Sequence, residues 1–265
     1  MPKTDFRTPR VYVDAPLASG KEVALDRSQT NYLRNVLRLS EGDGVLLFNG
    51  RDGEWRAELG SAKKALTAMP SEQAREQPQP LDLHFLVAPL KHARLDYLVQ
   101  KAVEMGVSLL QPVITQHTQV KRINLERMRA NTIEAAQQCG VLALPDVKEP
   151  VAFKTIAGTA DTERLLVFCD EDADVKDPVA ALASMRPSGL ALLPAESARR
   201  SNPFNLPLAV LIGPEGGFAE EEREILSKRP NVVRIALGPR ILRADTAAVA
   251  ALALVQTVLG DWRGA

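Results

Sequence analysis

The sequence predicts an α/β protein, in which a mostly parallel β-sheet fills the C-terminal part and a small β-barrel or sandwich precedes it. Beyond residue 80, apolar runs of strand length alternate with segments of helical periodicity, which is typical of a parallel sheet with helices on its faces. Before residue 70, short apolar runs are separated by turns that contain glycine, as in small β-domains. Three prolines among polar residues at 70–80 indicate a linker between the two parts.

The linker places an N-terminal domain at residues 1–72 and a C-terminal domain at residues 80–265. In the first domain, strands are expected at residues 11–13, 45–48 and 55–59, and a helix at 28–39. Asn49-Gly50 is a dipeptide that closes β-hairpins.

In the second domain, Leu95, Leu98 and Val99 mark one face of a helix that Gly106 ends. The last helix, about residues 247–259, is apolar on nearly all faces, so we expect it to be buried or to pack against a partner chain. Strands are expected at residues 81–88, 109–114, 165–169, 190–193, 208–212 and 232–237.

Composition excludes several classes of protein. The 265 residues include 33 Lys+Arg and 33 Asp+Glu, so nucleic acid can be attracted only by local basic patches. Cys139 and Cys169 are not in metal-ligand spacing, so no metal site is expected. No signal peptide and no apolar run of membrane-spanning length is recognisable, and we expect a cytoplasmic protein.

Two glycine-containing loops are the candidate ligand site. The strand at 208–212 runs into Gly213, Gly216 and Gly217 before an acidic helix start. Glycines at the carboxyl end of a parallel strand allow close approach of a ligand. The loop lacks a phosphate-binding lysine, and its acidic residues disfavour an anion. A plain tight turn is the alternative.

The second loop follows the strand at 232–237 and carries Arg240 and Arg243. These side chains can meet a carboxylate or an RNA phosphate; surface ion pairs are the alternative. Asp245 or Thr246 is expected to cap the next helix, and for Asp245 we favour this role over catalysis. With the strand at 190–193, three strand ends would converge on one pocket.

Basic side chains form two clusters without interleaved aromatic residues, which does not indicate base stacking. Such clusters are often only solvated surfaces. The clusters comprise Arg7, Arg10, Arg34 and Arg38, and Lys121 and Arg122 with Arg127 and Arg129.

Gly213-Pro-Glu-Gly-Gly217, Leu237-Gly-Pro-Arg-Ile-Leu-Arg243 and Asp245-Thr-Ala247 together resemble the RsmE-type 16S rRNA (uracil-N3)-methyltransferases of the SPOUT superfamily. The likeness extends over nearly the whole chain, through Asn35-Val-Leu-Arg38 and the blocks at 101–107 and 133–140. It implies a PUA-like RNA-binding β-barrel followed by a SPOUT domain with a trefoil knot. It also implies a homodimer that methylates N3 of one uridine of 16S rRNA within the small ribosomal subunit.

The resemblance implies S-adenosylmethionine as cofactor, bound by backbone around Leu192, Gly213, Gly216, Leu237, Gly238, Ile241 and Leu242. We expect Glu215 to stabilise the cationic sulfonium and Arg243 or Arg240 to stabilise the uracil as its N3 proton leaves. We assign RNA phosphates to Arg10, Arg34, Arg38, Lys121 and Arg122. No residue is assigned as general base.

The sequence departs from the family pattern at four places. Asn31 stands where His is common, Asp245 where Glu is commoner, Val141 where Arg is expected, and residues 115–118 replace a more basic segment. Three alternatives of function stand beside the resemblance. The first is an enzyme of the superfamily that acts on tRNA, 23S rRNA or a ribosomal protein. The second is a non-catalytic RNA-binding protein, which the intact glycines of both loops disfavour, and the third is a nucleotide-binding α/β enzyme, which the missing phosphate-loop lysine and the acidic first turn disfavour.

Overall fold

The computed structural model describes residue 5 and residues 7–62, 65–120, 122–159, 161–174, 177–186 and 206–262. Its contacts divide the chain into two units, Met1–Pro78 with Ala136–Leu144, and Gln79–Ala135 with Pro145–Ala265. The first unit therefore takes in a short segment from far along the sequence. The N-terminal strands alone do not complete it.

The first unit is a five-stranded sheet with the order β1-β3-β4-β5-β2. β1 pairs with β3 in parallel, and the other pairs are antiparallel. The fully buried Leu33, Leu47 and Leu66 lie in its core. Its elements are β1 (Arg10–Tyr12), β2 (Val23–Ala24), α1 (Arg27–Asn31), the π-helix η1 (Tyr32–Val36), β3 (Gly44–Phe48), β4 (Glu54–Ala62) and β5 (Ala65–Arg75).

Two details differ from the sequence prediction. Residues 70–75 belong to β5 and not to a linker. Pro70 is tolerated there because it pairs with Ala57 beside an irregularity in the β4–β5 register, the kind of position where a strand accepts proline. The turn at Asn49 is a longer loop than a two-residue hairpin, because the Asn49 side chain accepts the backbone N–H groups of Arg51 and Asp52.

The second unit is built on a seven-stranded sheet with the order β12-β10-β11-β6-β7-β8, in which β9 also pairs with β7. All of its strand pairs are parallel, as predicted. The strands are β6 (Leu83–Val87), β7 (Leu109–Ile114), β8 (Asp146–Val147), β9 (Val151–Ala152), β10 (Leu165–Cys169), β11 (Leu208–Ile212) and β12 (Val232–Ile235). The helices are α2 (His92–Glu104), α3 (Leu125–Cys139), α4 (Phe153–Ala157), α5 (Pro178–Ser184), α7 (Glu220–Ser227) and α8 (Ala244–Val258).

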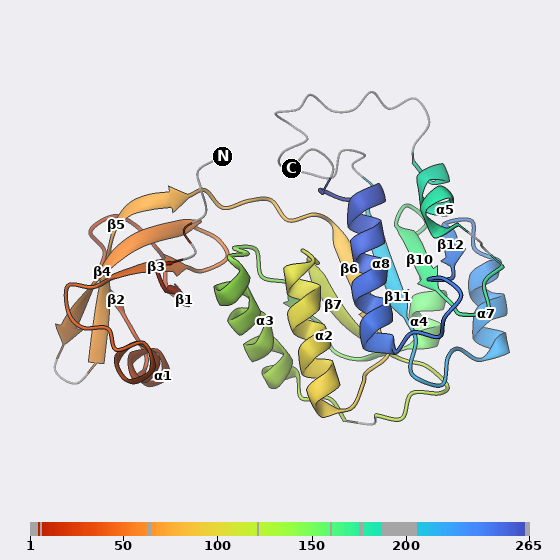
Figure 1. The fold of residues 1–265 in the computed structure, drawn as a ribbon, viewed down its shortest axis with the longest axis horizontal. Coiled ribbons are helices and arrows are strands. Elements are labelled where there is room, and N and C mark those ends of the chain that lie inside the picture. The colour runs from red at the N-terminus through yellow and green to blue at the C-terminus, as the bar shows by residue number, and fades with distance from the viewer. Residues whose placement is uncertain are drawn as a thin grey trace. The chain divides into compact units, whose positions relative to one another are not determined.

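The apolar strands are buried on both faces of this sheet. Along β10, Leu165 and Val167 belong to the larger core, which includes residues of α2 and α8. Leu166 and Phe168 belong to a second core, which includes residues of α4 and α7. Figure 1 shows α2 and α8 in front of the strands. This double burial explains why the central strands are continuous apolar runs.

The predicted strand at 190–193 lies outside the described residues, and the trefoil knot stays a prediction. Among the described residues, no helix combines the length and apolar character needed to cross a membrane.

Candidate active site

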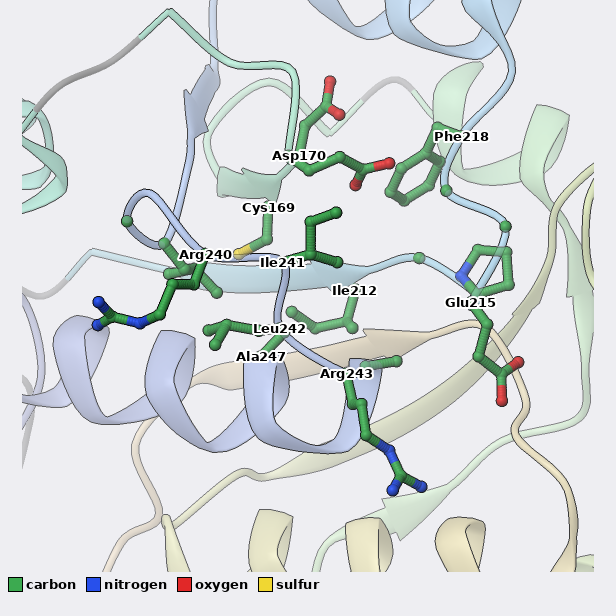
Figure 2. A pocket seen from close by; sticks show the side chains of 18 of the residues that line it. Cys169, Asp170, Ile212, Glu215, Phe218, Arg240, Ile241, Leu242, Arg243 and Ala247 are labelled. Atoms are coloured by element: carbon green, nitrogen blue, oxygen red, sulfur yellow. The ribbon is translucent and has the colours of Figure 1, made fainter.

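A cavity of about 620 Å³ lies at the carboxyl ends of β10 and β11 (Figure 2). The loop after β12 also lines it. Its lining comprises residues 169–171, 212–218 and 237–244, together with Ala247. The carboxyl ends of adjacent parallel strands are the usual ligand site of open α/β sheets. The volume lies within the range of small-molecule sites.

The two loops singled out in the sequence meet at this cavity. Of the residues predicted to bind the cofactor, Gly213, Glu215, Gly216, Leu237, Gly238, Ile241 and Leu242 all line it, as do the predicted catalytic Arg240 and Arg243. Leu192 lies outside the described residues. Among the described residues, a third strand, β10, also ends at the cavity. It contributes Cys169 and the two residues that follow it, Asp170 and Glu171. Two acidic residues directly after a buried strand were the signal that sequence reasoning passed over.

Gly213 is required by the protein's own packing. A Cβ at this position would lie 2.6 Å from a ring carbon of Phe218. Phe218 is buried and contacts Phe168 edge-on at 4.8 Å between ring centroids. The absence of a side chain at Gly213 therefore allows the chain to leave β11 in close contact with the Phe218 ring, against which the cavity loop packs.

Residues 115–118, which follow β7, make hydrogen bonds to the Gly213–Gly217 loop and to the helix after it. The Gln116 N–H donates to Glu222 Oε1 at 2.9 Å, and His117 Nδ1 lies 3.0 Å from the Gly216 carbonyl oxygen, which accepts its proton. Glu222 Oε2 also accepts the Ala219 N–H at the start of α7. Residues 115–118, where the sequence departs from the family pattern, thus fix the cavity loop.

Arg94 of α2 joins the two cavity loops. Its guanidinium pairs with Glu215 of the first loop and, through Nε at 3.1 Å, with Asp245 after the second. The hydrogen bond from Arg94 holds the pKa of the Asp245 carboxyl below its ordinary value. Arg243 Nε lies 3.7 Å from the same carboxylate. Sequence reasoning missed Arg94, because no local pattern sets it apart from other helix arginines.

The predicted cap of the last helix is wrong. Arg243 occupies the cap position of α8 and makes no side-chain cap bond. Asp245 lies within the first turn and accepts from Arg94 and from the Thr246 N–H. The Arg94 guanidinium, which is distant in the sequence, thus binds the carboxylate that the sequence pattern assigned to a helix cap.

An acidic cluster at the end of β10 is neutralised by arginines. Carboxylate oxygens of Asp170, Glu171 and Asp172 lie within 4.8 Å of one another. Asp170 is fully buried and accepts from Arg223 at 3.1 Å and Arg234 at 2.7 Å. These pairs compensate the buried charge, as burial of a carboxylate demands.

The cavity fits a nucleoside that carries a positive charge. Its walls include Ile212, Leu237 and Leu242, and Glu215 brings a carboxylate to the rim. Burial, together with the Asp170 charge, raises the pKa of the Cys169 thiol to about 12, so this wall residue stays neutral. The apolar side chains of this lining suit an adenosine, and Glu215, which also pairs with Arg94, is the carboxylate that a sulfonium would meet.

The predicted RNA-binding residues fall into different environments. Arg10 does not fit a phosphate-binding role: its side chain is only 3% exposed and pairs with the buried Glu54, which also binds Arg75. Arg38 is exposed and Arg34 is half-buried on the first unit. Arg122 is exposed and lines a second cavity of about 330 Å³ in the second unit. Lys121 lies outside the described residues.

Comparisons with known proteins decide the family. Residues 77–256 match the model of the RNA methyltransferase domain, and residues 25–68 match the RNA methyltransferase PUA domain. The ribosomal RNA small subunit methyltransferase E of Synechocystis is 30% identical over 89% of this chain and 73% of that protein. The chain belongs to the ribosomal RNA small subunit methyltransferase E family.

Other members of this methyltransferase E family agree. The protein of Rickettsia conorii is 28% identical over 93% of this chain and 94% of its own length. A solved member from Neisseria gonorrhoeae, bound to S-adenosylmethionine, is 27% identical with a TM-score of 0.78 and covers 97% of this chain and 100% of that chain. A methyltransferase of Legionella pneumophila, in complex with the same cofactor, is 28% identical with a TM-score of 0.76 over 95% of this chain and 98% of that chain. The predicted family is confirmed, as is a PUA-like domain followed by a methyltransferase domain. The cofactor that the sequence predicts is the one bound in these two solved relatives.

Proposed function

We propose that this protein transfers the methyl group of S-adenosylmethionine to N3 of one uridine of 16S rRNA in the assembled small ribosomal subunit. The observation that carries the proposal is the cavity at the strand ends, lined by both loops that resemble the family's motifs. Relatives that match nearly the full length are named as methyltransferases of small-subunit rRNA, and one of them is bound to this cofactor.

Bound S-adenosylmethionine would supply an electrophilic methyl group on a positively charged sulfur. The backbone at Gly213, Gly216 and Gly238 lies open to the cavity and would contact the cofactor. Among the described residues, no heavy atom beyond its chain neighbours lies within 4 Å of the Cβ position of Gly238, whose φ is 103°. Glu215 would favour the positive charge, while Arg94 keeps this carboxylate from leaving the rim.

Uracil N3 becomes anionic as it loses its proton, so a guanidinium near the uracil oxygens would lower the barrier. Figure 2 shows the guanidinium groups of Arg240 and Arg243 pointing in different directions. Because they do not converge on one point, only one of them would contact the uracil oxygens. We assign Arg243, because Asp245 lies 3.7 Å from its Nε and limits its freedom.

Replacing Arg243 by Ala tests this assignment. Loss of one donor to a developing oxyanion costs about 10²- to 10³-fold in turnover. Cofactor affinity, measured by calorimetry, should change less than threefold. Arg240→Ala is the matched control and should retain turnover within about tenfold. Equal losses in the two variants would remove Arg243 from its special role.

We infer that two copies form the working enzyme and that it acts in the cytoplasm, where small subunits are assembled. Ile241 supports pairing, because it is 95% exposed at the cavity mouth, and so do the half-buried Val249, Ala250 and Ala253 of α8. Sedimentation of the wild-type protein should give twice the 28.9 kDa chain mass, and a monomeric mass would refute the pairing.

A further inference from the structure

The cavity wall contains a second carboxylate besides Glu215 that a bound molecule can reach. Glu171 follows β10 and lines the cavity, and its side chain is 54% exposed. The preceding Asp170 also lines the cavity, but its side chain is fully buried and pairs with two arginines. Glu171 is therefore the acidic group at this strand end that is open to a ligand.

The sheet brings Glu171 level with the first glycine loop. β10 and β11 are adjacent parallel strands, and Cys169 pairs with Ile212 at their carboxyl ends. The chain therefore leaves both strands at the same edge of the sheet. The Glu171 side chain reaches Gly217, where its Oε1 occupies the space in which a Cβ would lie. The carboxylate thus lies directly against the loop that would contact the cofactor.

Arg223 of α7 fixes one side of this carboxylate. Its Nη2 lies 3.5 Å from Glu171 Oε1, and its Nε pairs with Asp170 at 3.1 Å. The Arg223 side chain is only 13% exposed, so it is a well-packed anchor. Among the described residues, Oε2 of Glu171 accepts no hydrogen bond. One oxygen is therefore held by the protein, and the other is a free acceptor at the cavity wall.

We propose that Glu171 binds the ribose of S-adenosylmethionine by accepting a hydrogen bond from one of its hydroxyl groups. An acidic residue beyond a glycine loop binds the ribose in the same way in dinucleotide-binding α/β folds. A neutral hydroxyl fits better than the ammonium group of the cofactor, because Arg223 lies 3.5 Å from the carboxylate and would repel a second cation. The inference rests on the proposed function, from which it takes the cofactor.

Calorimetry with S-adenosylhomocysteine, the product that lacks the methyl group, and with its 2′-deoxy and 3′-deoxy analogues tests this contact. A hydrogen bond to a charged acceptor contributes about tenfold or more in affinity. The wild type should therefore bind one of the deoxy analogues about tenfold more weakly than S-adenosylhomocysteine. Glu171→Ala should bind S-adenosylhomocysteine about tenfold more weakly than the wild type and should no longer distinguish that analogue. Glu171→Gln keeps an acceptor oxygen and should retain part of the discrimination.

Asp172→Ala is the matched control. Asp172 is 65% exposed and pairs with the same Arg223 nitrogen at 2.9 Å, but it does not line the cavity. Its removal takes the same charge from the cluster and should change affinity for S-adenosylhomocysteine less than twofold. Glu171→Ala should keep its melting temperature within about 2 °C of the wild type, because an exposed ion pair contributes little to stability.

Methylation kinetics give an independent readout. The ribose does not change during methyl transfer, so its binding contributes equally to the ground state and the transition state. Glu171→Ala should therefore raise KM for S-adenosylmethionine about tenfold and leave kcat within about twofold of the wild type.

The ligand series separates the outcomes. If the deoxy analogues lose the same affinity in Glu171→Ala as in the wild type, or if Asp172→Ala weakens binding as much as Glu171→Ala, the inference is wrong. It is also wrong if Glu171→Ala instead abolishes the penalty of an analogue that lacks the α-amino group, because the carboxylate then binds the ammonium. If the wild type binds S-adenosylmethionine but does not methylate small subunits, the proposed substrate fails, and the calorimetry still decides the role of Glu171. If the wild type does not bind S-adenosylmethionine, both proposals fail.

Discussion

Replacing Gly213 by Ala should loosen the cavity loop by a predictable amount. The new Cβ would lie 2.6 Å from one ring carbon of Phe218 and 3.1 Å from two others. Carbon atoms in contact are ordinarily about 3.5–4.0 Å apart, so loop and ring must separate by about 1 Å. The ring cannot retreat freely, because it is 2% exposed and packs on Phe168 and Phe153. Most of the displacement therefore falls on the loop.

Overpacking of this kind costs about 1–3 kcal/mol, which corresponds to a fall in melting temperature of about 2–12 °C for a chain of this size. Urea unfolding measures the stability, and calorimetry measures S-adenosylmethionine binding, which should weaken about tenfold or more as the loop shifts.

A double-mutant cycle isolates the clash. Phe218→Leu removes the ring carbons that the new Cβ would meet, so Gly213→Ala should cost at least 1 kcal/mol less in that background. An equal cost in both backgrounds, or a cost below about 0.5 kcal/mol in the wild type, would refute the role assigned to Phe218.

Two further predictions concern Arg94 and Cys169. Arg94→Gln should lower the free energy of unfolding by about 1 kcal/mol and reduce turnover about tenfold, because the two cavity loops lose their common partner. The Arg94 hydrogen bond lowers the pKa of Asp245 from 3.8. The Arg94–Asp245 pair therefore stabilises the folded protein above that pH, and this contribution is lost on acidification. Wild-type stability should therefore fall more steeply than that of Arg94→Gln below about pH 4, and parallel pH curves would contradict the pairing. Cys169, whose thiol pKa burial raises to about 12, should resist iodoacetamide at pH 8 until the protein is unfolded; rapid native labelling of this residue would show that the cavity wall opens.

The sequence was sufficient for the parts of the site that follow from local pattern. Apolar strands ending in glycine loops predicted that residues after β11 and β12 meet at one edge, and the cavity confirms this arrangement. The parallel sheet was equally predictable, since strands buried on both faces have continuous apolar runs.

Contacts between distant residues were beyond sequence reasoning. Arg10 looked available for phosphate, but its partner Glu54 lies 44 positions away. Asp245 looked like a helix cap, but Arg94, 151 positions away, binds its carboxylate. The inclusion of Ala136–Leu144 in the first unit has the same origin, because Arg75 donates to the Gly140 carbonyl at 3.0 Å.

The most direct test of the account is to detect the modified nucleoside. Small ribosomal subunits and purified 16S rRNA, both lacking the modification, are incubated separately with the protein and S-adenosylmethionine, digested to nucleosides and analysed by mass spectrometry. The account predicts N3-methyluridine at one site in the subunits and much less in free rRNA. Cofactor binding without any N3-methyluridine would contradict the assigned substrate, and absence of cofactor binding would contradict the enzyme assignment itself.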